Sequence, residues 1–339
     1  MSGSRRFQIG PGILMIGLFS GGLAVAGEPY DADFSLRFAG ALTRFSPYAD
    51  VAAMANTSAA NKWPSAINPG SLPWQHAPGK MRLCLAPQVS AILFDEGSDL
   101  YVGASTLTWE SEHWGAFQPS GAVIRSNIHE TRLGPDLRFN AEYLQFQWGI
   151  RPAEEWSIGA NFNYTSSSLS FEEGPITFAE SQMEAYDFRF GVLYSPVKRF
   201  RAGLVLDYGF ADRETDLPFG VHEEDAPEQW LVRPGVAYEY AENSTVFLDY
   251  QFVYLMDASG ELDLRRFSVG VEQQVFRGAL VRGGMLVDAT GHFTWTCGVG
   301  TSPMKTLSID LAYQHDMFPE VARELGGSGV ITLSVSISF

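Results

Sequence analysis

Apolar and polar residues alternate along most of the chain after residue 82, most regularly at the C-terminus. Ile331, Leu333, Val335, Ile337 and Phe339 share one face there, and threonine and serine fill the positions between them. A period of two residues is that of a β-strand whose faces meet different environments. Similar runs of about ten to fourteen residues recur upstream, longer than the ~5–6 residues usual in soluble sandwiches. Such lengths are typical of membrane-spanning barrels.

Fourteen segments follow this pattern, and the connections between them tend to alternate in length. Connectors such as 152–154 and 241–243 are short, whereas those at 171–182 and 212–228 are long. Outer-membrane barrels have an even strand number, short periplasmic turns and long extracellular loops. We therefore predict an all-β fold, a transmembrane antiparallel β-barrel of the bacterial outer membrane with both termini in the periplasm. The predicted strands are 83–94, 100–110, 114–125, 139–151, 155–170, 183–196, 199–211, 229–241, 244–257, 263–276, 279–288, 293–301, 306–316 and 329–339.

The N-terminus has the features of a secretory signal peptide over residues 1–26. Arg5 and Arg6 precede an apolar stretch, and residues 24–26 (Ala-Val-Ala) give the small-x-small pattern that signal peptidase recognises. A membrane-anchoring helix is the alternative, but five glycines and a proline interrupt the stretch from 9 to 26. Later segments lack the ~20 mostly apolar residues of a spanning helix, which leaves strands as the means of crossing.

Composition changes this picture little but excludes several functions. Only 18% of residues are charged although 45% are hydrophobic, as expected when the outward half of each strand excludes charge. The net charge of −16 argues against nucleic-acid binding, which needs Lys and Arg to neutralise phosphates. Cys84 and Cys297 cannot build a multi-cysteine metal site, and we expect both to be small buried residues without a disulfide. No cofactor is predicted.

Charged side chains on the strands would point into the lumen, because a charge facing lipid costs ~2–4 kcal/mol. There they would pair across strands and hold an internal plug, or they would line a substrate path. A carboxylate ligand would favour Arg189, Arg266 or Arg282. The predicted inward charges are Asp187, Arg189, Asp207, Glu239, Asp249, Arg266, Glu272, Arg282 and Asp310.

Proline and glycine within a strand weaken the hydrogen-bond ladder, and the wall could open at such places. The candidates are Pro87 in the first predicted strand and Pro234-Gly235 in the eighth. A tolerated bulge is the alternative at each position.

An acidic loop is predicted over residues 212–228. It could bind a divalent ion or stay solvated, but its spacing matches no known calcium loop, so no metal is predicted. The carboxylates concerned are Asp212, Glu214, Asp216, Glu223, Glu224 and Asp225. The six histidines are scattered and the chain has no Gly-x-Ser-x-Gly elbow, so we predict that it is not an enzyme.

Residues 27–82 do not alternate and are rich in Ala, Asn, Ser and Pro. We predict that they form a plug, or hatch, inside a barrel of residues 83–339. Asn68-Pro69-Gly70, the small residues before it and the final Phe339 together resemble the FadL-type family of outer-membrane transporters of hydrophobic compounds. The family usually has Ala where Gly70 stands. This chain is also short for the family, so trimmed extracellular loops are expected.

The resemblance implies a plugged barrel through which hydrophobic small molecules, such as long-chain fatty acids or hydrocarbons, diffuse. Hatch rearrangement or a lateral opening in the wall would release them. The C-terminal strand ending at Phe339 resembles the signal read by the barrel-assembly machinery, and lipid and lipopolysaccharide would surround the barrel.

A structural or assembly barrel that binds a protein partner is the alternative function, and a general porin is a third. An apolar cleft between hatch and wall would favour transport. A plug sealed by salt bridges without such a cleft would favour the assembly role.

Overall fold

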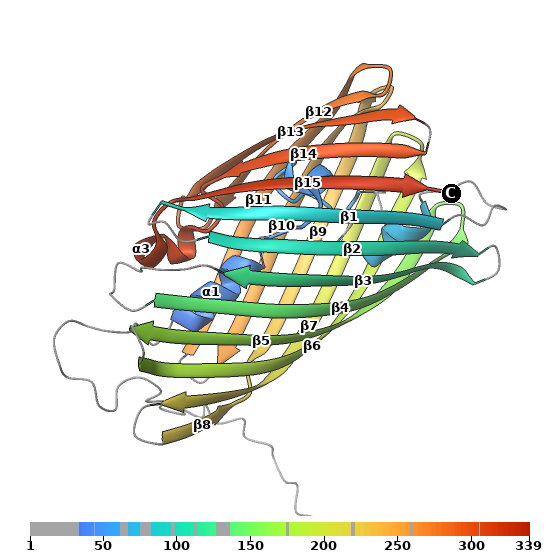
Figure 1. Cartoon of the computed structure of the whole chain (residues 1–339). Helices are drawn as coiled ribbons and strands as arrows, with labels where there is room; N and C mark the ends of the chain where they lie inside the picture. Colours follow the sequence, from blue (N-terminus) through green and yellow to red (C-terminus); the bar gives the residue numbers. More distant parts are fainter. Residues whose placement is uncertain are drawn as a thin grey trace, which may run out of the picture.

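The chain folds into a closed barrel of antiparallel strands that encloses a small helical segment (Figure 1). Within the described part of the chain, no helix is long and apolar enough to cross a membrane. The signal peptide predicted at residues 1–26 lies outside that part. The computed structural model describes residues 34–43, 45–61, 67–74, 83–95, 99–111, 114–126, 136–173, 176–217, 221–257, 260–304 and 306–339.

Fourteen of the described strands form the wall, each hydrogen-bonded to the next, and the first wall strand pairs with the last. This confirms the predicted fold class and strand number. A short strand, β8 (Val221–Asp225), extends the far end of β7 as a hairpin. The wall strands are β1 (Leu83–Phe94), β2 (Asp99–Ser111), β3 (Gly115–Ser126), β4 (Asp136–Ala153), β5 (Trp156–Glu173), β6 (Ile176–Val197), β7 (Phe200–Leu217), β9 (Glu228–Ala241), β10 (Ser244–Asp257), β11 (Gly260–Phe276), β12 (Ala279–Asp288), β13 (Phe293–Met304), β14 (Leu307–His315) and β15 (Ser328–Ser338).

The longest strands exceed their predicted limits, and β6 reaches 22 residues. Residues 212–217 belong to β7 and residues 221–225 to β8, so the prediction of a loop over 212–228 is wrong. These residues are mostly polar at both odd and even positions. An alternation of hydrophobicity cannot reveal a strand that is polar on both faces.

Side chains of the wall alternate between the outer face and the lumen. In β10, Leu248 and Tyr250 are exposed on the outside, whereas Phe247, Asp249 and Gln251 are buried inside. The outside is therefore apolar and the inside polar, as the two-residue period requires.

A row of aromatic side chains crosses the outer face of β5, β6, β7 and β9. The register places Phe162, Phe188, Tyr208 and Trp230 at one level. The ring centroids of Phe162 and Phe188 lie 5.3 Å apart, and those of Tyr208 and Trp230 lie 4.4 Å apart. Such rows are typical of the girdle at a membrane–water interface.

The two cysteines are free but differ in environment. Cys84 is buried in β1, whereas Cys297 is exposed on the outer face of β13. The expectation of burial is therefore wrong for Cys297, because the inner positions of β13 belong to its neighbours Thr296 and Gly298.

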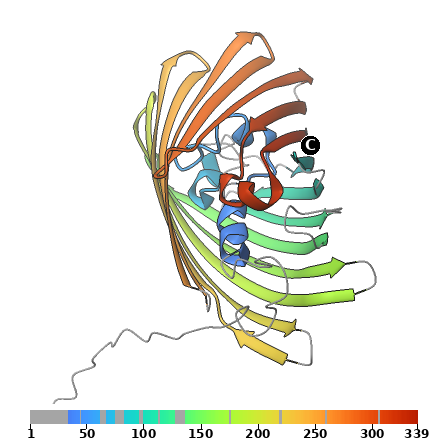
Figure 2. The ribbon, with the colours of Figure 1, turned by 90° about the vertical axis from the view of Figure 1, so that its left-hand side faces the viewer.

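The described part of the predicted hatch lies inside the barrel (Figure 2). It contains α1 (Phe34–Leu42), α2 (Ala49–Ala52) and the 3-10 helix η1 (Pro69–Trp74). We use the word hatch for residues 34–74. Residues 51–61 are all buried, and most have small side chains, so the backbone can come close to the wall.

The connection between β14 and β15 also folds into the barrel and covers the hatch. It contains η3 (Pro319–Val321) and α3 (Ala322–Leu325) and is called the cap here, residues 316–327. Met317, Phe318 and Leu325 of the cap are buried in one apolar cluster with Phe38 of α1.

The two ends of the barrel differ in their connections. Turns at 154–155, 198–199 and 242–243 are short and lie at the same end as the C-terminus, which is called the short-turn end. The cap lies at the opposite, long-loop end (Figure 1). There Arg37 of α1 donates to both carboxylate oxygens of Glu324, at 2.9 and 3.0 Å.

Candidate functional site

Asn68, Pro69 and Gly70 bind the hatch to the wall. The side-chain amide of Asn68 donates to the carbonyl of Ala59 at 2.6 Å and to that of Val192 in β6 at 3.0 Å. Its side-chain oxygen accepts the N–H of Gly70 at 2.8 Å. One asparagine thus closes a turn within the hatch and ties it to the barrel, because an amide offers both donors and an acceptor.

Three wall glycines receive this motif. Gly149, Gly159 and Gly191 are neighbours across β4, β5 and β6. A Cβ atom at Gly191 would overlap the side-chain oxygen of Asn68, and one at Gly159 would overlap the carbonyl group of Pro69. Glycine in a strand often marks a close backbone approach, and here it brings the hatch backbone against the wall.

The same arrangement continues around the barrel. Cβ atoms added at inward glycines of five further strands would overlap hatch residues between Ala53 and Ala60. These are Gly203 in β7, Gly235 in β9, Gly270 in β11, Gly284 in β12 and Gly298 in β13. With the previous three they form the glycine belt. Among the described glycines, none on β14, β15, β1, β2 or β3 approaches the hatch in this way.

Asp249 binds the hatch from β10, next to the belt. Its carboxylate accepts the backbone N–H groups of Ser58, at 2.8 Å, and Ala59, at 2.9 Å. The side chain is buried, so these two bonds replace the water that an ionised carboxylate requires.

Two buried arginines that the sequence prediction omitted bind hatch carbonyls. Arg201 donates to the carbonyl of Ala60 at 3.2 Å, and Arg233 donates to that of Asn56 at 3.3 Å. The signal was present for Arg201, because the alternation that places Leu204 outward also places residue 201 inward.

Five of the predicted inward charges pair with one another, on adjacent strands or, for Arg282 and Asp310, across the intervening strand β13. Arg282 bonds Glu272 at 2.8 Å and Asp310 at 2.5 Å. Arg189 bonds Asp207 at 2.7 Å. The guanidinium groups are thus already satisfied by wall carboxylates. Glu239 is half-buried in β9.

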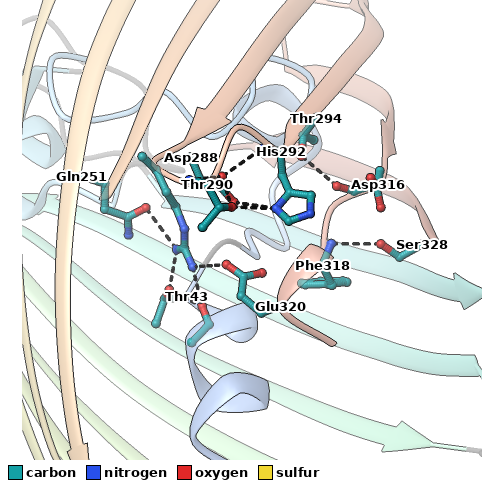
Figure 3. A network of polar contacts seen from close by, with 12 residues as sticks. Thr43, Gln251, Asp288, Thr290, His292, Thr294, Asp316, Phe318, Glu320 and Ser328 are labelled. Atoms are coloured by element: carbon teal, nitrogen blue, oxygen red, sulfur yellow. Dashed lines mark hydrogen bonds and ion pairs between the residues drawn. The ribbon is translucent and has the colours of Figure 1, made fainter. Parts of the chain in front are cut away.

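Arg266 connects the wall to both the hatch and the cap. Its guanidinium donates to the hydroxyl of Thr43 at 2.7 Å, to the carbonyl of Gly40 at 2.8 Å and to Glu320 at 2.7 Å. Figure 3 shows Thr43, Gln251 and Glu320 around this point, and Asp288, whose carboxylate closes the neighbouring turn. At the long-loop end, Arg266 therefore holds the hatch and the cap to the wall.

A cavity of about 380 Å³ lies between the hatch and the wall, which is within the usual size of small-molecule sites. Its apolar side includes Leu42, Phe45 and Ile67 of the hatch and Val102 and Ile124 of the wall.

Polar side chains of the wall also line the cavity. Gln145, Asn163 and Asp187 form a row across β4, β5 and β6, and all three line the cavity. Asp187 and Arg189, two residues apart on β6, are the predicted inward charges that line the cavity.

The predicted wall prolines interrupt the ladder without shifting its register. Pairing between β1 and β15 skips Ala86 and Pro87, and pairing between β9 and β10 skips residues 233 and 234. Proline has no N–H to donate, which explains both gaps. Gly235 remains paired and belongs to the glycine belt.

A third proline, which the sequence prediction omitted, interrupts the wall on the other side of the first hairpin. Pairing between β2 and β3 skips Gln118 and Pro119. The hairpin β1–β2 is therefore weakly bonded along both outer edges. Gln88 and Ser120, next to Pro87 and Pro119, line the cavity.

The acidic hairpin of β7 and β8 is held by an arginine. Arg213 pairs with Asp225 at 2.5 Å and with Asp257 at 3.1 Å. Within the described ranges, no group of three or more His, Cys, Asp or Glu residues could hold a metal ion.

Solved structures of a transporter, a channel and a FadL homologue share this fold over most of their length. The Ralstonia pickettii toluene transporter TbuX has a TM-score of 0.59 and 14% identity, over 88% of this chain and 99% of that chain. The CymD monoaromatic hydrocarbon channel has a TM-score of 0.60 and 15% identity, over 88% and 98%. A Pseudomonas aeruginosa FadL homologue has a TM-score of 0.59 and 12% identity, over 86% and 98%.

The class that these observations define is a closed membrane-type barrel with an internal hatch. Its particular form is the FadL-type fold, which confirms the resemblance at the level of the fold. No family profile matches the sequence, and no curated protein matches it. TbuX is named as a transporter and CymD as a channel, which is consistent with the prediction that this chain is not an enzyme.

Proposed function

We propose that this chain is a channel of the bacterial outer membrane that takes up hydrophobic small molecules by diffusion. The observation that carries the proposal is the cavity between hatch and wall, which apolar residues line in large part and a weakly bonded hairpin borders. The fold shared with a toluene transporter and a monoaromatic hydrocarbon channel supports it.

The route through the barrel follows from how the hatch is held. The glycine belt, Asn68 and Asp249 fix the hatch on the β4–β13 side, which opposes passage along the barrel axis. The cavity extends from strands β4–β7 to the hairpin β1–β2, where Gln88 and Val102 line it. A ligand that passes Gln88 and Ser120 and separates this hairpin from its neighbours would enter the membrane sideways. A lateral exit therefore fits the geometry better than hatch rearrangement.

The orientation follows the usual one of outer-membrane barrels, with short turns and both termini in the periplasm. The cap would then face the outside. Lipid and lipopolysaccharide would contact the outer aromatic row, and the barrel-assembly machinery would read the strand that ends at the exposed Phe339.

An assembly barrel without transport is the second candidate. The ion pairs of Arg266 and Arg282 seal parts of the lumen, as that function would require. The apolar cavity has no place in such a plug, so we favour transport.

Filling the cavity tests the proposal. Ala122→Phe adds an aromatic ring inside the cavity, whereas Val123→Phe adds one on the exposed outer face of the same strand. In a strain lacking the chromosomal copy, uptake of labelled toluene and palmitate above the empty-vector level should fall with Ala122→Phe and persist with Val123→Phe. If the wild-type chain, folded in the membrane, raises uptake of neither probe, the channel function is refuted.

A further inference from the structure

Three lumen aspartates stand over a glycine of the neighbouring strand. In each pair, a Cβ atom added to the glycine would overlap a carboxylate oxygen, so the glycine makes room for the charged group. The pairs are Asp249 over Gly235, Asp310 over Gly300 and Asp187 over Gly209.

Two of these carboxylates receive donors from the protein. Asp249 accepts two backbone N–H groups of the hatch, and Asp310 accepts the guanidinium of Arg282. Asp187 of β6 faces Gly209 of β7 in the same way. However, none of the described residues donates a hydrogen bond to its carboxylate. Arg189, the nearest arginine on its strand, gives its Nε and one terminal nitrogen to Asp207 instead.

The carboxylate of Asp187 faces the cavity, together with the amides of Asn163 and Gln145. A second carboxylate, Glu228, also lines the cavity, whereas Arg189 is its one arginine among the described lining residues and is neutralised by Asp207. The excess charge on the cavity is therefore negative, and a desolvated negative charge is strongly unfavourable without a donor.

We infer that the channel selects uncharged amphipathic ligands that carry a hydroxyl or N–H donor, and that Asp187 is the residue that binds the donor and repels carboxylates. The inference rests on the proposed uptake of hydrophobic molecules and names the ligand class of that same cavity. The hydrocarbon body of such a ligand lies against Leu42, Phe45 and Ile67 of the hatch, while its donor reaches Asp187 of strand β6.

Three probes of one shape separate the possibilities. In p-cresol a methyl group of p-xylene is replaced by a hydroxyl donor, and in p-toluate it is replaced by a carboxylate. Channel-dependent initial uptake is measured in cells that lack the chromosomal copy, with and without the plasmid-borne protein. The wild-type chain should take up p-cresol about tenfold faster than p-xylene, because a hydrogen bond to a charged group discriminates by at least that factor. Uptake of p-toluate should be the slowest.

Two variants assign the selectivity to Asp187. Asp187→Leu removes the acceptor and should bring p-cresol and p-xylene to equal rates. Asp187→Asn keeps a neutral acceptor and should raise p-toluate uptake severalfold while it reduces the preference for p-cresol. Asp212→Asn, on the exposed part of β7, is the matched control and should behave as wild type. Folding of each variant is checked by gel electrophoresis, because folded barrels change their mobility when they are heated. If Asp187→Leu does not fold, Asp187→Asn alone tests the inference.

The outcomes separate the two proposals. No channel-dependent uptake of any probe by the folded wild-type chain would refute the channel function itself. Equal wild-type uptake of p-cresol and p-xylene, rapid wild-type uptake of p-toluate, or an unchanged preference in both Asp187 variants would overturn the selectivity inference and leave the channel function standing.

Discussion

Residues without side chains fix the hatch in this barrel. Gly149, Gly159 and Gly191 allow backbone atoms of the hatch to touch the strands, and Asn68 supplies the polar bonds across that contact. A methyl group at such a position has nowhere to go, because backbone lies on both sides. Overpacking of this kind usually costs about 1–3 kcal/mol.

Gly191→Ala should therefore destabilise the hatch more than the barrel. The added Cβ overlaps the Asn68 side-chain oxygen, so the hatch must shift, and ions should leak through the variant in planar bilayers. Gly103→Ala is the control, because its Cβ would meet only Val123 at 3.8 Å. Equal conductance of the two variants would show that the belt does not hold the hatch.

Sequence reasoning reached these residues in part. Alternation placed Asp249 in the lumen, but it could not find its partners Ser58 and Ala59, which lie about 190 positions earlier in the chain. Strand glycines were visible as well. What they contact depends on how the hatch sits in the lumen, and a two-residue period carries no information about that.

At the scale of elements, the wall is uneven. Most neighbouring strands pair continuously, but the hairpin β1–β2 has gaps in its ladder towards both β15 and β3. Pro234 leaves a similar gap between β9 and β10, on the side of the barrel where the hatch is held by Gly235 and Asp249. The gap at Pro234 therefore lies where the hatch is bonded to the wall, whereas the gaps beside the hairpin β1–β2 lie next to the cavity.

Pro87→Val should slow uptake, because it restores an N–H at the edge of β1 and strengthens the joint with β15. Each recovered ladder bond is worth about 1 kcal/mol, so the thermal unfolding temperature should also rise. Pro234→Val makes the same repair away from the cavity and should raise stability without slowing uptake. If both variants slow toluene uptake equally, the exit does not lie at β1–β2.

The elements themselves were largely predictable, and the exceptions share a cause. The limits of β1, β10 and β12 agree with the prediction, because their outer faces are apolar over the whole strand. The hairpin of β7 and β8 was missed because it is polar on both faces. The inward fold of the cap was missed because Arg37 and Glu324, which bind it to α1, are 287 residues apart in sequence.

On the scale of the whole molecule, the charges and aromatic residues indicate how the barrel sits in the membrane. The aromatic row lies below the long polar ends of β6 and β7, and the short turns lie at the opposite end. The barrel should therefore expose the cap and the β7–β8 hairpin to the outside and the turns to the periplasm.

Labelling of single cysteines tests this orientation. Cys84 and Cys297 are first replaced by alanine, and Thr290→Cys or Glu154→Cys is then introduced at an exposed position of each end. A membrane-impermeant maleimide should label Thr290→Cys on intact cells, and Glu154→Cys only after the outer membrane is permeabilised. The opposite pattern would invert the proposed orientation.

The joint between β1 and β15 is also the place where the two ends of the wall meet. A chain that threads into a membrane can complete its cylinder there only after the last strand has arrived, with the hatch already enclosed. Pro87 leaves that final joint with fewer bonds than a regular one. Pairing of β1 with β15 would then complete the assembly of the barrel, and separation of the same two strands would let a ligand leave sideways into the membrane.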